Sequence, residues 1–409
     1  MRGFLSRNPS VPWFLGALAV LTLAVTLLSS AYGAGYLSTS FVKTLGMTLC
    51  LCLAAVAMDV VWGHTGILSL GHMAFFALGG YMIGMWLMYA RTQGIVIESL
   101  AGGGLPPTPQ EVRDGVAAQI FGVVGGSDLP VVWTFAQSLP IQLALVVLVP
   151  GTLALAFGWL AFRSRVTGVY LSILTQAMTL ALSLYLFQNE AGLRGNNGLS
   201  GLQNIPGLEA VGQDALSVRF LWASAAALGL GYLAAAFIVS GKFGSVLRAI
   251  RDDEQRVRFL GYPVEGYKLF VFTLTAVMAG IAGALYYPQA GIINPAEMAP
   301  IASIYLAVWV AIGGRGRLYG AVIGAAVVSL LASAFTGGRV PDLPLGFATI
   351  LWVDWWLVLL GGSFVLVTLH APRGLGGLFD RLAQRRPPDR HGADLGPDAG
   401  ALREREADA

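Results

Sequence analysis

The sequence predicts an all-α fold, a polytopic transmembrane helical bundle of about 10 spans with broken or re-entrant segments. The 409 residues are 56% hydrophobic and only 11% charged, whereas an ordinary soluble domain has about 25% charged residues. Apolar runs of about 20 residues, the length that crosses a bilayer as a helix, recur along the chain. The lysines and arginines gather in alternate connections between these runs, as they do in multi-pass membrane proteins.

The apolar runs give the expected positions of the spans in chain order. They lie at residues 11–30, 41–61, 72–90, 139–162, 169–187, 220–240, 268–287, 301–313, 318–335 and 352–370. The first run exceeds the apolar core of a secretory signal, about 7–15 residues, so we expect a retained span and keep a cleaved signal as the alternative. Pairs of small residues one turn apart, such as Gly80 and Gly84, indicate close helix packing in lipid.

The distribution of positive charge predicts the orientation. If the N-terminus is cytoplasmic and the spans alternate, nineteen lysines and arginines lie inside and six outside. Such a bias towards the cytoplasmic side is typical of multi-pass proteins. We therefore expect a multi-pass membrane protein with both termini cytoplasmic, long outer loops at 91–138 and 188–219, a transmembrane domain at 1–370 and a disordered cytoplasmic tail at 371–409.

Two segments interrupt the helical pattern. One is WGHTGILSLGH at 62–72, and the other is QAGIINPAEMAP at 289–300, which precedes a span of only 13 residues. Interrupted or short apolar segments are typical of half-helices that line a pathway in transporters, and plain loops are the alternative. The polar residues near this expected pathway are Ser69, His72, Thr175, Gln176 and Asn294.

The sequence offers little support for catalysis or for a bound cofactor. Ser69 and His72 stand three apart, but the surrounding residues lack the pattern of a nucleophile elbow. His64 and His72 have no cysteine or carboxylate nearby, so we expect no metal site. The loop GYPVEGYK at 261–268 lacks the lysine and hydroxyl positions of a phosphate-binding loop. We expect a non-catalytic membrane subunit with no cofactor and no nucleic-acid partner, whose energy source lies outside the chain.

One short stretch has an unusual density of charge. In RAIRDDEQRVRFLGYPV, residues 248–264, seven of the first eleven residues are charged. Leu247, Ile250, Val257 and Leu260 fall on one face at helical spacing, which predicts a short amphipathic helix that ends near Gly261 and Pro263. We interpret it as a docking element for a soluble protein, because a solvated inner loop explains the arginines but not the acidic residues or the apolar face.

This stretch resembles the cytoplasmic coupling loop of branched-chain amino acid (LivM-like) permeases of ATP-binding cassette importers. Arg251, Asp252, Glu254 and Gly261 match its pattern, while Arg256 and Val257 replace two alanines. Further similarity lies in GHTGILSLGHMAFFALGGY (63–81), AGIAGALY (279–286) and AIGGRGRLYGAVIGA (311–325). The segments RSRVTGVYLSILTQAMTLAL (163–182) and NEAGLRGNNGLSG (189–201) look more like the urea-transporter (UrtC) type.

The resemblance implies a multi-subunit importer of urea. It implies a complex in a bacterial inner membrane, with a second, LivH-like permease, two ATPase subunits and a periplasmic substrate-binding protein, and with nucleotide-driven closure transmitted through the coupling loop. The residues assigned to that loop are Arg248, Arg251, Asp252, Asp253, Glu254, Arg258 and Gly261. Branched-chain amino acids as cargo of the same machine, and a stand-alone urea or amide channel, are the alternatives.

Overall fold

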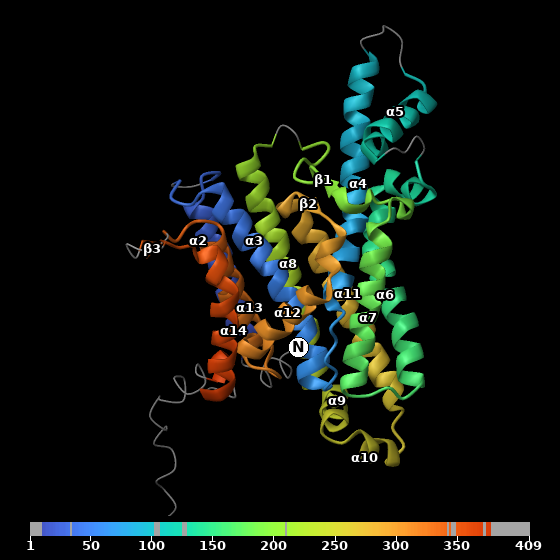
Figure 1. The fold of residues 1–409 in the computed structure, drawn as a ribbon. Coiled ribbons are helices and arrows are strands. Elements are labelled where there is room, and N and C mark those ends of the chain that lie inside the picture. Colours follow the sequence, from blue (N-terminus) through green and yellow to red (C-terminus); the bar gives the residue numbers. More distant parts are fainter. Residues whose placement is uncertain are drawn as a thin grey trace, which may run out of the picture.

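The computed structural model describes residues 10–32, 35–101, 107–124, 129–208, 211–341, 343–344, 349–370 and 374–377. Eight helical segments in this part of the chain are long and apolar enough to cross a membrane. They are α2 (Ser10–Leu28), α3 (Thr39–Asp59) with the π-helix η1 (Val60–His64), α4 (His72–Ala101), α6 (Leu139–Arg163), α7 (Val169–Phe187), α8 (Gln213–Ser240), α11 (Val264–Ala290) and α13 (Leu318–Thr336). Two further apolar helices, α12 (Pro300–Gly313) and α14 (Trp352–His370), complete the bundle shown in Figure 1.

Short elements connect these helices. They are α5 (Pro109–Phe121), η2 (Gly122–Val124), η3 (Val131–Gln137), η4 (Asn189–Ala191), η5 (Gly195–Asn197), α9 (Lys242–Asp252), α10 (Glu254–Phe259) and η6 (Pro295–Met298). The strand β1 (Leu199–Ser200) pairs antiparallel with β2 (Ile292–Ile293), with Leu199 opposite Ile293. The strands β3 (Leu343–Pro344) and β4 (Thr349–Ile350) form a second antiparallel pair.

The centre of the bundle is formed by α3, α4 and α11, and small residues let α4 and α11 approach closely. A Cβ atom added to Gly79 would lie 2.0 Å from the carbonyl oxygen of Gly280, and one added to Gly283 would lie 1.8 Å from that of Phe76. Backbone approach of this kind stabilises helix pairs in lipid through van der Waals packing. The core therefore depends on glycines that hydropathy alone counts as neutral.

The chain between α3 and α4 is broken within the bundle. The π-helix η1 leads into an irregular segment at residues 65–71, and α4 begins at His72. The backbone of residues 65–71 is hydrogen-bonded by two side chains of α7: Ser172 donates to the carbonyl of Leu68 (2.7 Å), and Thr175 accepts from the Leu70 amide (3.0 Å). The Met73 amide, in the first turn of α4, donates to Ser303 (3.1 Å). Irregular backbone at membrane depth requires such internal partners.

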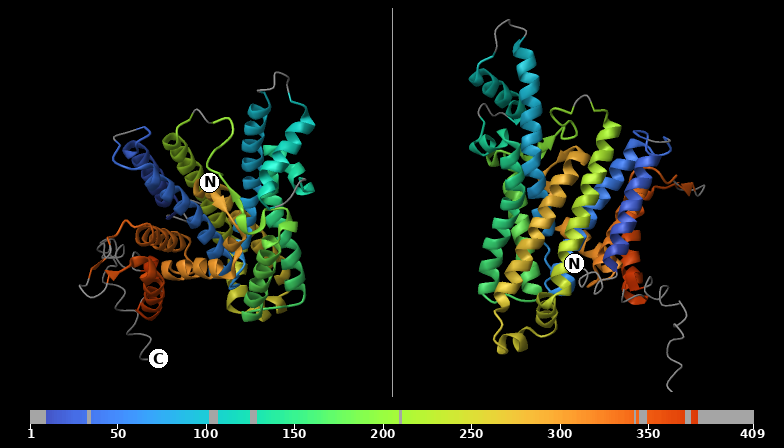
Figure 2. Two further views of the ribbon diagram at one scale, coloured as in Figure 1. Left: turned by 45° about the horizontal axis from the view of Figure 1, so that its top comes forward. Right: turned by 180° about the vertical axis from the view of Figure 1, so that it is seen from behind.

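The two ends of the bundle differ in structure. The helix α5 and its neighbour η3 lie at one end, beside the extended top of α4, whereas α9 and α10 lie at the opposite end (Figures 1 and 2). The expected outer loop 91–138 and the charged stretch 248–264 are thus on opposite sides of the bundle, as the alternation of spans predicts.

The all-α polytopic fold is confirmed, with ten apolar helices at the expected positions. Two helices are longer than expected: α4 continues to Ala101 and α8 begins at Gln213. The tail from residue 371 lies outside the described residues except for 374–377, so its disorder stays a prediction.

Candidate functional site

The charged stretch forms two helices, α9 and α10, which we call the α9–α10 unit (residues 242–259). Asp253 separates them, because its carboxylate accepts a hydrogen bond from the Arg256 amide (3.0 Å) and caps α10. The expected single helix is therefore divided. Leu247, Ile250 and Val257 are buried as predicted, but Leu260 is 72% exposed since it follows the end of α10.

Salt bridges tie the α9–α10 unit to the start of α11. Glu254 pairs with Arg258 at 3.0 Å and also contacts Lys268, whose side chain is 6% exposed. Arg258 in turn pairs with Glu265 at 2.9 Å. Glu254 thus braces α10 against α11, and its part in ATPase docking stays a prediction. Exposed groups here include Arg256 and the 90% exposed Phe259, whose apolar ring the charge pattern did not single out.

Arg251 joins the α9–α10 unit to the broken segment. Its guanidinium donates to the carbonyl of Gly63 in η1 (2.8 Å) and pairs with the neighbouring Asp252 (3.0 Å). Gly66 allows this approach: its backbone has φ +82°, and a Cβ added there would lie 2.9 Å from the Arg251 Cγ. A side chain at residue 66 would therefore be strained and would press on the arginine.

Asp59 binds the same region from inside the bundle. Its carboxylate is fully buried and accepts a hydrogen bond from the Gly316 amide (2.6 Å) in the connection between α12 and α13. The His64 ring lies 3.2 Å from the Asp59 carbonyl and 3.7 Å from its carboxylate. We call Asp59, Gly63, Arg251 and Gly316 the inner latch, because together they connect α3, α9 and the α12–α13 connection.

The other predicted coupling residues lie around this latch. Arg248 donates to the carbonyl of Val239 (2.9 Å) at the end of α8. Asp252 is exposed, and Gly261 has φ +85° in the turn that follows α10. All seven predicted residues therefore lie on or directly beside the α9–α10 unit. Their role in coupling stays a prediction.

The five predicted pathway residues do not form one cluster. Ser69, His72 and Thr175 are buried together around the broken segment, where His72 lies 3.1 Å from the Thr275 hydroxyl. The Ser69 hydroxyl has no hydrogen-bond partner among the described residues. Gln176 is half-buried on α7, whereas Asn294 caps η6 by accepting from the Ala296 amide (3.0 Å).

A group that the sequence patterns did not bring together lies beside Asn294. The carboxylate of Glu297, in η6, interacts electrostatically with Tyr81 of α4 and with Tyr286 and Tyr287 of α11. The glutamate is visible in the sequence as a charge in an interrupted segment. The tyrosines, however, are distant in the chain, and their spacing within apolar helices is that of ordinary packing residues.

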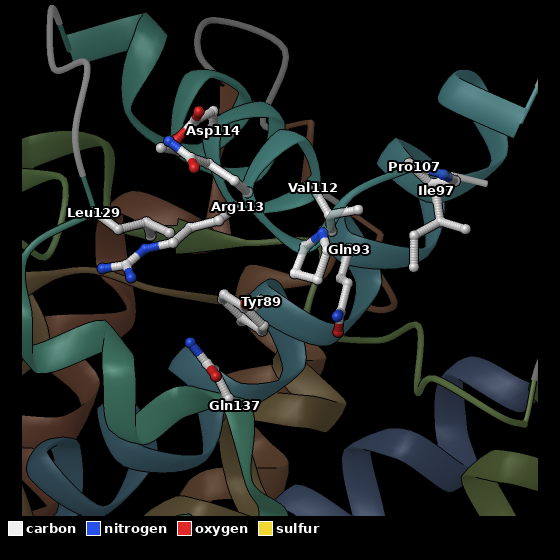
Figure 3. A pocket seen from close by; sticks show the side chains of 12 residues that line it. Tyr89, Gln93, Ile97, Pro107, Val112, Arg113, Asp114, Leu129 and Gln137 are labelled. Carbon is white, nitrogen blue, oxygen red and sulfur yellow. The ribbon is translucent and has the colours of Figure 1, made fainter. Parts of the chain in front are cut away.

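An open groove lies at the opposite end of the molecule from the α9–α10 unit. It has a volume of about 970 Å³ and lies between the upper part of α4, α5 and η3. Figure 3 shows Tyr89 of α4, Arg113 of α5 and Gln137 beside η3 lining it. The described residues contain no group of three or more His, Cys, Asp or Glu side chains that would hold a metal ion.

Comparison with known proteins agrees with this architecture. A family model described as the branched-chain amino acid transport system permease component matches residues 40–368. The chain is 24% identical over 386 residues to the high-affinity branched-chain amino acid transport system permease protein LivM of Escherichia coli, covering 88% of this chain and 74% of that protein. It is 25% identical to LivM of Salmonella typhimurium, covering 80% and 68%.

A shorter match links the chain to another import system. It is 32% identical over 132 residues to the autoinducer 2 import system permease protein LsrC of Yersinia pestis, covering 31% of this chain and 34% of that protein. No solved structure matches the chain. The family model covers most of the ten-helix bundle, the broken segment and the α9–α10 unit, so the chain belongs to the branched-chain amino acid transport system permease family.

Proposed function

We propose that this chain is the permease subunit of an ATP-binding cassette importer that moves urea across the inner membrane. Family membership establishes a multi-pass permease of an importer. Coupling to a partner ATPase is supported by the inner latch, in which Arg251 of the α9–α10 unit donates to the Gly63 carbonyl at 2.8 Å. This contact gives a movement of the unit a direct mechanical route into the broken segment.

The latch suits a chain whose energy comes from a partner. Salt bridges of Glu254 and Arg258 join α10 to the start of α11, so we expect the α9–α10 unit to move together with that end of α11 when an ATPase binds its exposed tip. A rigid body that pulls on η1 shifts residues 65–71 against α7, to which their backbone is hydrogen-bonded. Small shifts of this kind switch packed helices between discrete arrangements.

The partners follow from the two ends of the bundle. We assign the α9–α10 unit and both termini to the cytoplasm, where two ATPase subunits dock, and the α4–α5 groove to the periplasm, where a substrate-binding protein delivers the solute. A LivH-like permease completes the membrane complex. Lysines and arginines crowd the connections that this orientation makes cytoplasmic, in agreement with the positive-inside rule.

Urea is favoured as the solute by the similarity of residues 163–182 and 189–201 to the UrtC type, and by the neutral polar groups at the broken segment. Urea is uncharged and is recognised by hydrogen-bond donors and acceptors. Ser69, His72 and Thr175 offer such groups in the buried region around the broken segment. Branched-chain amino acids, the cargo named for LivM of Escherichia coli, are the competing candidate.

The test is ATP-dependent uptake by the full complex in vesicles, with labelled urea and labelled leucine compared. We expect urea uptake that requires ATP and saturates. Uptake of leucine alone would keep the importer and replace its cargo. Urea flux that is independent of ATP and of the ATPase subunits would overturn the importer and favour a channel.

A further inference from the structure

We infer that Glu297, Tyr81 and Tyr287 form a binding site for a solute group that carries adjacent N–H donors, such as the two amide groups of urea. We call these three residues the carboxylate–tyrosine site. The inference rests on the proposed function, since it assigns the solute of the same transporter to a place in the structure. It differs from the pathway residues predicted from the sequence.

The loop at 188–219 and the helix α7 hold the segment of Glu297 in position. The segment that carries it pairs through β2 with β1, and the Leu202 amide donates to the carbonyl of Gly291 (3.1 Å). Ser183 of α7 donates to the carbonyl of Pro295 (3.3 Å), and Asn294 caps η6. The backbone on both sides of the carboxylate is therefore anchored to neighbouring elements, as a preorganised binding group requires.

The two tyrosines approach Glu297 from different helices. Tyr81 is 0% exposed and Tyr287 1% exposed. Both interact electrostatically with the Glu297 carboxylate. The Tyr287 hydroxyl reaches it in a loose hydrogen bond, whereas the Tyr81 hydroxyl has no hydrogen-bond partner among the described residues. A buried hydroxyl without a partner costs about 1–3 kcal/mol. An unpartnered hydroxyl and a loosely bonded one beside the same carboxylate indicate a place where a ligand supplies the missing bonds.

The ring of Tyr287 is positioned by close packing. A Cβ added to Gly80 would lie 2.0 Å from the Tyr287 Cδ2, so the ring lies directly against the backbone of α4. Phe76 and Tyr286 contact the same ring edge-on, with ring centroids 5.6 Å and 5.2 Å from that of Tyr287. Neighbours on several sides thus restrict where the hydroxyl points.

The chemistry of the carboxylate–tyrosine site matches a donor-bearing solute. Among the described residues Glu297 forms no ion pair, and an ionisable group in an intramembrane segment generally marks a substrate pathway. A carboxylate accepts two parallel N–H bonds from a planar amide, while a phenol hydroxyl donates to a carbonyl. Urea offers both groups, whereas the ammonium of an amino acid offers the N–H donors and a positive charge.

The experiment measures KM and maximal rate of ATP-dependent uptake by the assembled complex for Glu297→Gln, Tyr81→Phe and Tyr287→Phe. We expect Glu297→Gln to raise the KM for urea about tenfold or more, because a hydrogen bond to a charged group is lost. Each Tyr→Phe variant should raise KM severalfold. The control is Tyr232→Phe, which removes the hydroxyl of another buried tyrosine. That ring lies on α8 and stacks on Phe14, outside the carboxylate–tyrosine site.

The outcomes distinguish a failure of the proposed binding site from a failure of the proposed solute. If the wild type takes up leucine and not urea, the proposed function fails, and Glu297→Gln then tests the site through the KM for leucine. An unchanged KM for whichever solute is transported, in all three variants, would overturn the inference. Should Glu297→Gln prevent assembly, the two isosteric Tyr→Phe variants still decide, since an unchanged KM in both would refute the site.

Discussion

Replacing Arg251 with alanine should separate ATP hydrolysis from transport. The guanidinium donates to the Gly63 carbonyl at 2.8 Å, and the side chain is 36% exposed. A hydrogen bond from a charged donor contributes about 1.5–3 kcal/mol, and partial exposure places this one near the lower end. A loss of about 1.5 kcal/mol corresponds to roughly a tenfold shift in an equilibrium between latched and released arrangements.

The assay compares two quantities in the same vesicles, namely solute taken up and ATP hydrolysed. We expect Arg251→Ala to lower the number of solute molecules per ATP by up to about tenfold, while the ATPase subunits still co-purify with the permease. Arg256→Ala is the matched control, because this arginine lies on the same unit, is 79% exposed and pairs with the nearby Asp253 at 3.5 Å.

Three results would refute the reasoning. An unchanged ratio of transport to hydrolysis in Arg251→Ala would mean that the Gly63 contact transmits no force. Equal losses in the arginine variants at 251 and 256 would mean that positive charge on the unit, and not the latch, governs coupling. Loss of the ATPase subunits from Arg251→Ala alone would place the residue in the docking surface.

Three further predictions follow from particular contacts. Phe259→Ser should weaken co-purification of the ATPase subunits at least about tenfold without lowering thermal stability. The Phe259 ring is 90% exposed and contributes little to the folding of the permease, whereas its burial by a partner would contribute about 1.5–3 kcal/mol to binding. Gly80→Ala should displace the Tyr287 ring and cost about 1–3 kcal/mol of stability, whereas Gly94→Ala, with nothing within 4 Å of the added carbon, should not. The pKa of Glu111 is lowered by hydrogen bonds from the backbone and hydroxyl of the threonine that caps α5. These bonds stabilise α5 near neutral pH and are lost as the pH falls through the lowered pKa, so the protection of the α5 amides against exchange, relative to the unfolded chain at the same pH, should fall in acid, and Glu111→Gln should abolish that pH dependence.

The elements set by local composition were predictable from the sequence. Ten apolar runs gave ten apolar helices, because the hydrocarbon core requires uninterrupted apolar side chains over a defined length. The glycine-rich break before His72 was likewise visible, since a helix cannot continue easily through residues with positive φ such as Gly66. The end of α4 was not, because the helix continues to Ala101 through polar residues that hydropathy assigns to a loop.

The contacts of the candidate site could not be predicted from the sequence, for a different reason. The inner latch joins Arg251 to Gly63 across 188 residues of sequence, and one partner is a backbone carbonyl that no residue type reveals. The amphipathic pattern of residues 247–260 also suggested one helix, whereas the Asp253 side chain caps a second one and leaves Leu260 outside the apolar face. Side-chain capping competes with helix continuation at an aspartate, and the periodicity of apolar residues contains no information about such capping.

The hydrogen bonds place α7 between the two parts of the proposed mechanism. Near its start, Ser172 and Thr175 hold the broken segment that Arg251 reaches from the other side. Near its end, Ser183 holds the Pro295 carbonyl, two residues before Glu297. A displacement of the broken segment therefore acts on a helix that also anchors the carboxylate–tyrosine site. Coupling through contacts needs an element with two arrangements that both sites bias, and α7 is the one helix among the described residues with side-chain hydrogen bonds to both the broken segment and η6.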